Sequence, residues 1–174
     1  MDSVEIEASF RYMPRRMGRR PLTTAAAPFR QRDQWPSAEM QQRLIEECGQ
    51  IPGVRLRRSR MAPPDTWALY LPDGIATGPP EAFIDQHEFC HVHGLPEGGL
   101  HLVLPHDMLA RVVDMGWAAR HPIRACGVLE TLAMVYAPRD PDELRVALHL
   151  VRCARWFAAG ALASVPTAPA AQVA

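Results

Sequence analysis

The stretch HEFCHVHGLPEGGLHLVLPH, residues 87–106, decides the fold because polar and apolar side chains alternate on both sides of a glycine-containing turn. In a β-strand, residues two apart share a face. The apolar residues of the stretch therefore form one face: Cys90, Val92, Leu100, Leu102 and Leu104. Three histidines, His91, His93 and His101, fall on the other. The pattern predicts a β-hairpin with an apolar face and a histidine face.

The turn of this hairpin decides whether the histidines meet. A five-residue loop over 95–99 places His93 opposite His101 and keeps the two apolar faces together. A two-residue turn over 97–98 would put His101 on the face away from His93 and would mismatch the apolar faces. The apolar pattern therefore favours the five-residue loop.

Histidines are concentrated here, because five of the seven in the chain lie between His87 and His106. Three imidazoles on one sheet face, with Glu97 or Glu88 nearby, can bind a divalent transition metal or transfer protons near neutral pH. Alternation of polar and apolar residues also occurs on a solvated sheet face. The residue types leave these roles open, and the predicted metal ligands are His91, His93, His101 and Glu97.

The rest of the chain predicts helices and strands around the hairpin. Ser37 and Asp140 stand where helix N-caps are expected, and Gly49 and Gly116 where helices end. The predicted helices cover 37–49, 106–117 and 140–160, and the predicted strands cover 54–61, 66–71 and 131–138.

This order of elements predicts an α+β fold with an antiparallel sheet and helices packed on one face, in a single domain over 37–160. The helix at 106–117 is expected to cover the leucine face of the hairpin, so the histidines face away from the helices. The loop 72–86, an N-terminal arm or a second subunit could close that histidine face. His149 is predicted on a solvated helix stripe.

Composition indicates the character of the two ends of the chain and the cellular location of the protein. The formal net charge is zero, all 19 basic residues are arginine, and seven of these lie between Arg11 and Arg32. We interpret 1–36 as a flexible Arg-rich arm and 161–174 as a disordered tail. The arm also supports a less favoured hypothesis, that of a nucleic-acid binder. Four scattered cysteines and no membrane-spanning run predict a cytoplasmic protein without a membrane partner.

From about 37 to 160 the sequence resembles the luciferase domain shared by fungal luciferases and small bacterial proteins. The segments that carry the resemblance are EFCHVHGLPEGGLHLVLP, GWAARHP and MVYAPRDPDEL. The matching positions are His91, His93, Gly98, Gly99, His101, Gly116, Trp117, His121, Tyr136, Pro138 and Arg139. Ala118 stands where the family pattern has glycine.

The resemblance implies an oxygenase-type enzyme, because the fungal members oxidise a hydroxylated pyrone with molecular oxygen and no organic cofactor. The expected substrate is a small electron-rich enol, pyrone or phenol. His91, His93 or His101 would act as the base, Arg139 would stabilise an oxyanion, and Trp117, His121 and Tyr136 would contact the substrate. The enzyme would be cofactor-independent or dependent on a divalent metal. The alternative is a non-catalytic protein that binds a small ligand or a metal.

Overall fold

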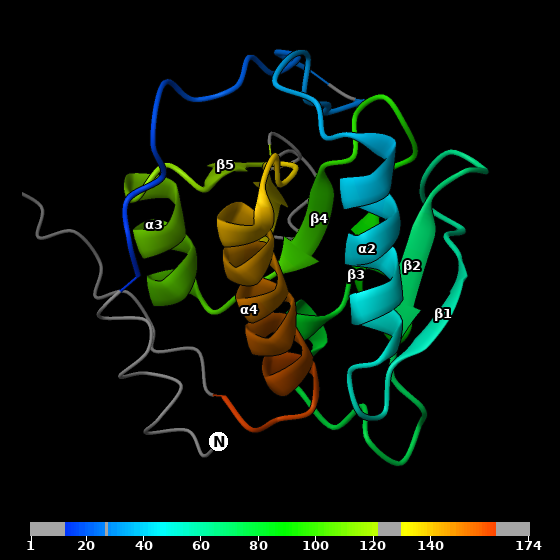
Figure 1. Cartoon of the computed structure of the whole chain (residues 1–174). Coiled ribbons are helices and arrows are strands. Elements are labelled where there is room, and N and C mark those ends of the chain that lie inside the picture. Colours follow the sequence, from blue (N-terminus) through cyan, green and yellow to red (C-terminus); the bar gives the residue numbers. More distant parts are fainter. Residues whose placement is uncertain (1–12, 27, 122–129, 163–174) are drawn as a thin grey trace, which may run out of the picture.

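The computed structural model describes residues 13–26, 28–121 and 130–162, and Figure 1 labels its elements. The strands are β1 (Arg55–Arg58), β2 (Trp67–Tyr70), β3 (Glu88–Val92), β4 (Leu100–Val103), β5 (Ala118–Arg120) and β6 (Leu132–Val135). The helices are α2 (Ala38–Gly49), α3 (His106–Asp114), α4 (Pro141–Ala158) and the short 3-10 helix η1 (Pro80–Ala82). The strands form one antiparallel sheet in the order β1-β2-β3-β4-β6-β5. All three α-helices lie on one face of this sheet (Figure 1), which confirms the predicted α+β class.

The hairpin of β3 and β4 is confirmed, but its register differs from the prediction by two residues. His91, rather than His93, lies opposite His101. The loop still has five residues, but it runs over 94–98 and the next pair is His93 with Gly99, whose carbonyl accepts from the His93 amide at 2.9 Å. Gly98 closes the loop one residue earlier than expected, because it takes a left-handed φ of 60° and donates to the Gly94 carbonyl at 3.2 Å. A shift of two keeps every side chain on its predicted face.

The helices begin where the sequence places their caps. Ser37 accepts from the Met40 amide at α2, and Asp140 accepts from the Asp142 and Glu143 amides at α4. The prediction that the helix at 106–117 covers the leucine face of the hairpin is wrong. The long helix α4 packs against β3 and β4, whereas α3 packs against β5.

Strand β5 was not predicted. Its three residues, Ala-Ala-Arg, have neither the alternation nor the β-branched side chains that mark a strand in a sequence. It is held by pairing with β6 at the sheet edge. The predicted disordered tail is wrong at its start, since Leu162 is buried in the core, and 163–174 lie outside the described residues.

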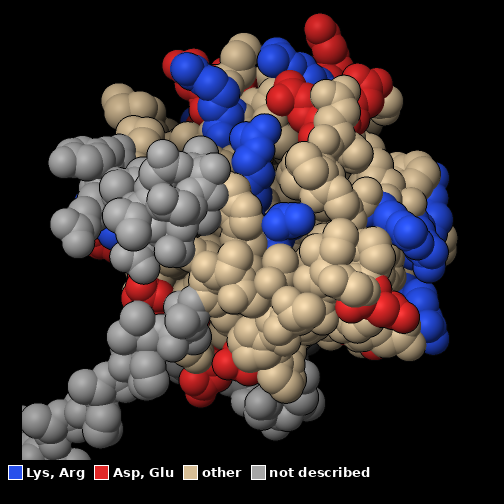
Figure 2. Space-filling view, turned by 90° about the horizontal axis from the view of Figure 1, so that it is seen from below, with Lys and Arg blue, Asp and Glu red and all other residues tan. Residues whose placement is uncertain are grey.

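The sheet edge formed by β1, opposite to the edge formed by β5, is strongly basic. Strand β1 presents Arg55, Arg57 and Arg58 to solvent. Figure 2 shows basic side chains gathered at its right-hand edge, the side on which Figure 1 places β1. Charged side chains on an edge strand discourage pairing with a second sheet. None of the helices in the described ranges is long and apolar enough to cross a membrane.

The arm that we expected to be solvated is packed against the domain over much of 13–36. Figure 1 shows it (blue) passing from α3 across the top of the sheet to α2. Met13, Arg16, Phe29 and Gln31 are buried. The Gln31 side chain accepts from the Ala137 amide at 2.9 Å, which ties the arm to the end of β6.

Candidate functional site

Three imidazoles converge on the face of the sheet away from the helices. His91 and His93 come from β3 and the residue after it, and His101 comes from β4. One ring nitrogen of each lies within 4.8 Å of those of the others. The three residues are only 4–7% exposed, so the cluster is shielded from bulk water. The sequence prediction that these three side chains meet is confirmed.

A carboxylate contacts the Nδ1 atom of each β3-side imidazole. Glu88 lies 2.7 Å from Nδ1 of His91, and Glu97 lies 3.1 Å from Nδ1 of His93. A carboxylate can only accept a hydrogen bond, so a neutral imidazole in this position carries its proton on Nδ1 and keeps a lone pair on Nε2. The ring of His101 forms a hydrogen bond with the backbone of Phe29.

The Nε2 atoms are the open positions of the cluster. Nε2 of His91, His93 and His101 are all buried and have no hydrogen-bond partner. Leaving a buried polar atom without a partner costs about 1–3 kcal/mol. Three such atoms on three clustered imidazoles indicate a place that a bound species would complete.

Both carboxylates are fixed by further contacts. Glu88 is fully buried, and its second oxygen accepts from the Tyr70 hydroxyl at 2.7 Å, with Ser59 at 3.2 Å from the first. Glu97 forms an ion pair with Arg30 at 2.7 Å. Each imidazole is thereby held in one orientation.

The N-terminal segment covers this face. The ring of Phe29 lies 6.5 Å from that of His101 and 5.2 Å from that of His121. Phe29, Arg30 and Gln31 close a crevice over His93 and His101, and between these described side chains there is essentially no free volume. Of the three covers that the sequence left open, the arm is the one in place. The loop 72–86 instead bonds to the end of α4.

Burial disfavours the charged form of His93 and His101. It lowers the pKa of His93 to about 3 and that of His101 well below its usual value, and neighbouring imidazoles lower both further. Burial likewise lowers the pKa of His121 to about 4. Neutral imidazole is the form that ligates metals, whereas a pKa so far below 7 makes a weak general base.

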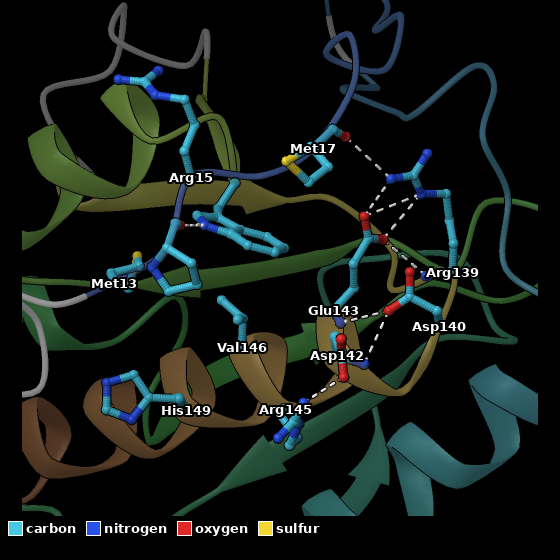
Figure 3. Close-up of a pocket in the computed structure, with 12 residues that line it drawn as sticks. Met13, Arg15, Met17, Arg139, Asp140, Asp142, Glu143, Arg145, Val146 and His149 are labelled. Carbon is cyan, nitrogen blue, oxygen red and sulfur yellow. Dashed lines mark hydrogen bonds and ion pairs between the residues drawn. The ribbon is translucent and has the colours of Figure 1, made fainter.

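The predicted substrate residues separate into two places. His121 joins the cluster, with its ring 4.8 Å from that of His101, and Tyr136 packs with Phe29 beneath the cover. Trp117 and Arg139 instead line a cavity of about 580 Å³ on the helix side. In Figure 3, Arg139 points to Glu143, whose carboxylate accepts from Nε at 3.0 Å. The structure therefore does not bring Arg139 to the histidines.

His149, which was predicted to be solvated, lies at the same cavity. His149 is half-buried and lines the cavity with Met13 and Val146 (Figure 3). Burial and the nearby Arg152 lower the pKa of its imidazole. Met13 of the arm lines the cavity beside it, so His149 is only partly exposed to solvent.

Phe29 and Arg30 are the site residues that sequence reasoning missed. They lie more than 60 residues before the histidines that they cover. No local pattern marks an arm residue as part of a site on a distant hairpin. Glu88 was noted as a neighbour, and the structure makes it the partner of His91.

Comparisons with known proteins find a family and several relatives that this chain resembles. The luciferase domain family matches residues 86–154, the segment from the hairpin through most of α4. The chain is 29% identical to a luciferase of Armillaria gallica over 154 residues, 77% of this chain and 56% of that protein. It is 30% identical to a luciferase of Neonothopanus nambi over 158 residues, 80% of this chain and 58% of that protein. The chain thus matches little more than half the length of these relatives. No solved structure matches it.

Proposed function

Because this chain carries a luciferase domain, we propose that it is an oxygenase-type enzyme that acts on a small electron-rich substrate at the histidine cluster. The substrate class is an enol, a pyrone or a phenol. The observation that carries the proposal is the set of three buried Nε2 atoms without partners, inside the segment that matches the family.

The chemistry needs an acceptor for the proton of the substrate hydroxyl, and an unprotonated Nε2 of the cluster can take it. An enol or phenol that loses its proton becomes an electron-rich anion, and this anion is the reductant while molecular oxygen is the oxidant. The three Nε2 atoms are buried, so little water competes with them for the hydrogen of a substrate hydroxyl. His121 and Tyr136 lie beside the same face.

Access requires displacement of the cover. Residues 29–31 lie in a connecting segment without helix or strand, held within the arm by the bridge of Thr23 with Gln31 and by hydrogen bonds such as that from the Arg30 amide to the Thr24 hydroxyl at 2.9 Å. Arg30 is about one-third exposed, so its ion pair with Glu97 is partly screened by solvent. We propose that substrate enters when Phe29 moves away from His101 and His121.

The test is oxygen consumption by the full chain with hydroxypyrones, enolised dicarbonyls and catechols. The wild type should consume oxygen with at least one class, and His93→Ala should lose this activity. His87→Ala is the matched control, because His87 lies outside the cluster, with a side chain that is 38% exposed beside Asp73. A wild type indistinguishable from buffer across the whole panel would refute the enzyme proposal.

A second candidate function, binding of a ligand or metal without turnover, is favoured by the closed cover. The crevice above the histidines has essentially no free volume among the described side chains. Phe29→Ala separates the two candidates. A covered enzyme should gain activity when the ring is removed, whereas a binding protein should consume no oxygen either as the wild type or as this variant.

A further inference from the structure

We infer that Nε2 of His91, His93 and His101 bind one divalent transition-metal ion, and that Glu88 and Glu97 orient these ligands without binding the ion. The inference does not depend on the proposed function, because an ion can be bound whether or not the protein turns over a substrate.

The spacing of the three histidines suits a single ion. The ligand nitrogens of the three residues lie within 4.8 Å of one another, a separation that one ion between them can bridge with small side-chain adjustments. Metal–imidazole bonds are about 2.0–2.1 Å long, so two ligands of one ion lie roughly 3–4 Å apart. The strands supply this arrangement directly, because His91 and His101 are opposite partners and His93 is two residues along the same face.

The Nε2 atoms are the ring nitrogens available to the ion. Nδ1 of His91 and of His93 already contact carboxylates, whereas all three Nε2 atoms have no partner. A cation bound by these nitrogens would give each of the three buried atoms a partner. A metal-bound histidine usually donates its second ring N–H to a carboxylate or carbonyl, which is the arrangement seen here.

Glu97 was predicted from the sequence to be a metal ligand, but its carboxylate is bound to other residues. Both oxygens of Glu97 are engaged, one by Arg30 at 2.7 Å and the other by His93 at 3.1 Å. Both oxygens of Glu88 are likewise engaged, by His91 and by Tyr70. Neither carboxylate belongs to the group of ligand atoms that lie within 4.8 Å of one another, so the described residues offer three nitrogen ligands.

The ligand type selects the metal. Imidazole suits Zn²⁺, Cu²⁺, Fe²⁺ and Ni²⁺, whereas Mg²⁺ and Ca²⁺ take oxygen ligands. Three protein ligands leave a coordination position open, as in catalytic rather than structural zinc sites. The three ligands are only 4–7% exposed, so bulk water competes little for the ion.

The experiment is metal analysis of the untagged full chain, followed by Co²⁺ titration of the chelator-treated protein with visible absorption and thermal unfolding as readouts. The wild type should bind one ion per chain and unfold at a higher temperature with metal present. His91→Ala with His93→Ala should abolish stoichiometric binding. His87→Ala should bind as the wild type does.

Glu97→Gln tests the orienting role and avoids loss of a ligand. It should still bind one ion with an absorption spectrum like that of the wild type, but with an affinity about 10–100-fold lower. A spectrum showing the loss of one ligand would overturn the assignment of Glu97, as would an unchanged affinity.

The outcomes separate this inference from the proposed function. A wild type that binds no more Co²⁺ than the double variant, with circular dichroism showing both folded, overturns the metal site while leaving oxygen consumption to be judged by its own assay. One bound ion with no oxygen consumption supports the metal site and overturns the enzyme proposal.

Discussion

Glu143, in the first turn of α4, connects the arm to the segment that leads into this helix. Its carboxylate is buried and pairs with Arg16 at 3.3 Å, and it also accepts from both the backbone and the side chain of Arg139. Arg16 is 5% exposed and its guanidinium lies over the ring of Tyr136. A buried cation is stable only while its counter-charge stays in place.

Glu143→Gln should therefore destabilise the protein by about 3 kcal/mol, since it leaves the buried Arg16 charge uncompensated. Urea unfolding followed by circular dichroism measures the change. The control is Arg145→Gln, which breaks a solvent-exposed pair with Asp142 on the same helix and should cost less than about 1 kcal/mol. Equal effects of the two substitutions would show that burial does not govern the energetics of these pairs.

At the scale of elements, the segment 72–86 is attached to the C-terminal end of α4. The Gly78 amide donates to the Ala158 carbonyl at 2.9 Å, and the Thr77 hydroxyl donates to the Ala159 carbonyl at 2.9 Å. These bonds satisfy carbonyls that the last turn of a helix leaves without partners. The attachment requires close approach of two backbones.

Gly78→Ala should cost about 1–3 kcal/mol, because its new Cβ would lie 2.3 Å from the Phe157 carbonyl oxygen. Backbone atoms cannot move away as the end of a flexible side chain can. Gly74→Ala, in the same segment, meets nothing within 4 Å and should change the unfolding free energy by less than about 0.5 kcal/mol. Chemical denaturation of both variants makes the comparison, and a Gly78 variant as stable as the Gly74 variant would disprove the contact.

At the scale of the whole molecule, one core joins elements distant in sequence. Cys48 from α2, Cys90 from β3 and Cys153 from α4 are all fully buried in it. Burial raises the pKa of Cys48 and of Cys153 to about 12, and that of Cys90 well above its usual value. The thiolate is the reactive form, so these thiols should be inert in the folded protein.

A Cys126→Ser variant removes the one thiol outside the described residues and should show no reaction with a disulfide reagent in its native state. In urea the other three thiols should react over a single transition that coincides with loss of circular dichroism, because they share one cooperative core. One thiol that reacts at lower urea than the others would reveal a separately unfolding element.

The hairpin and the two capped helices could be predicted from the sequence because their signals are local. Alternation over a few residues assigns His91 and Cys90 to opposite faces, and Ser37 and Asp140 act on amides within three residues. Strand β5 could not be predicted, since its pairing partner β6 rather than its own residues makes it a strand. The two-residue error in register arose at Gly98, where backbone geometry inside the loop set the pairing.

The sequence by itself determined that three histidines share one sheet face, because strand periodicity survives any even shift of register. Only the tertiary structure decided what surrounds them. Phe29 and Arg30 reach the cluster from the arm, and Glu88 and Glu97 turn to Nδ1 atoms, leaving the Nε2 atoms open. Such contacts depend on how distant segments pack together, and packing depends on the complementary shapes and charges of those segments rather than on local spacing.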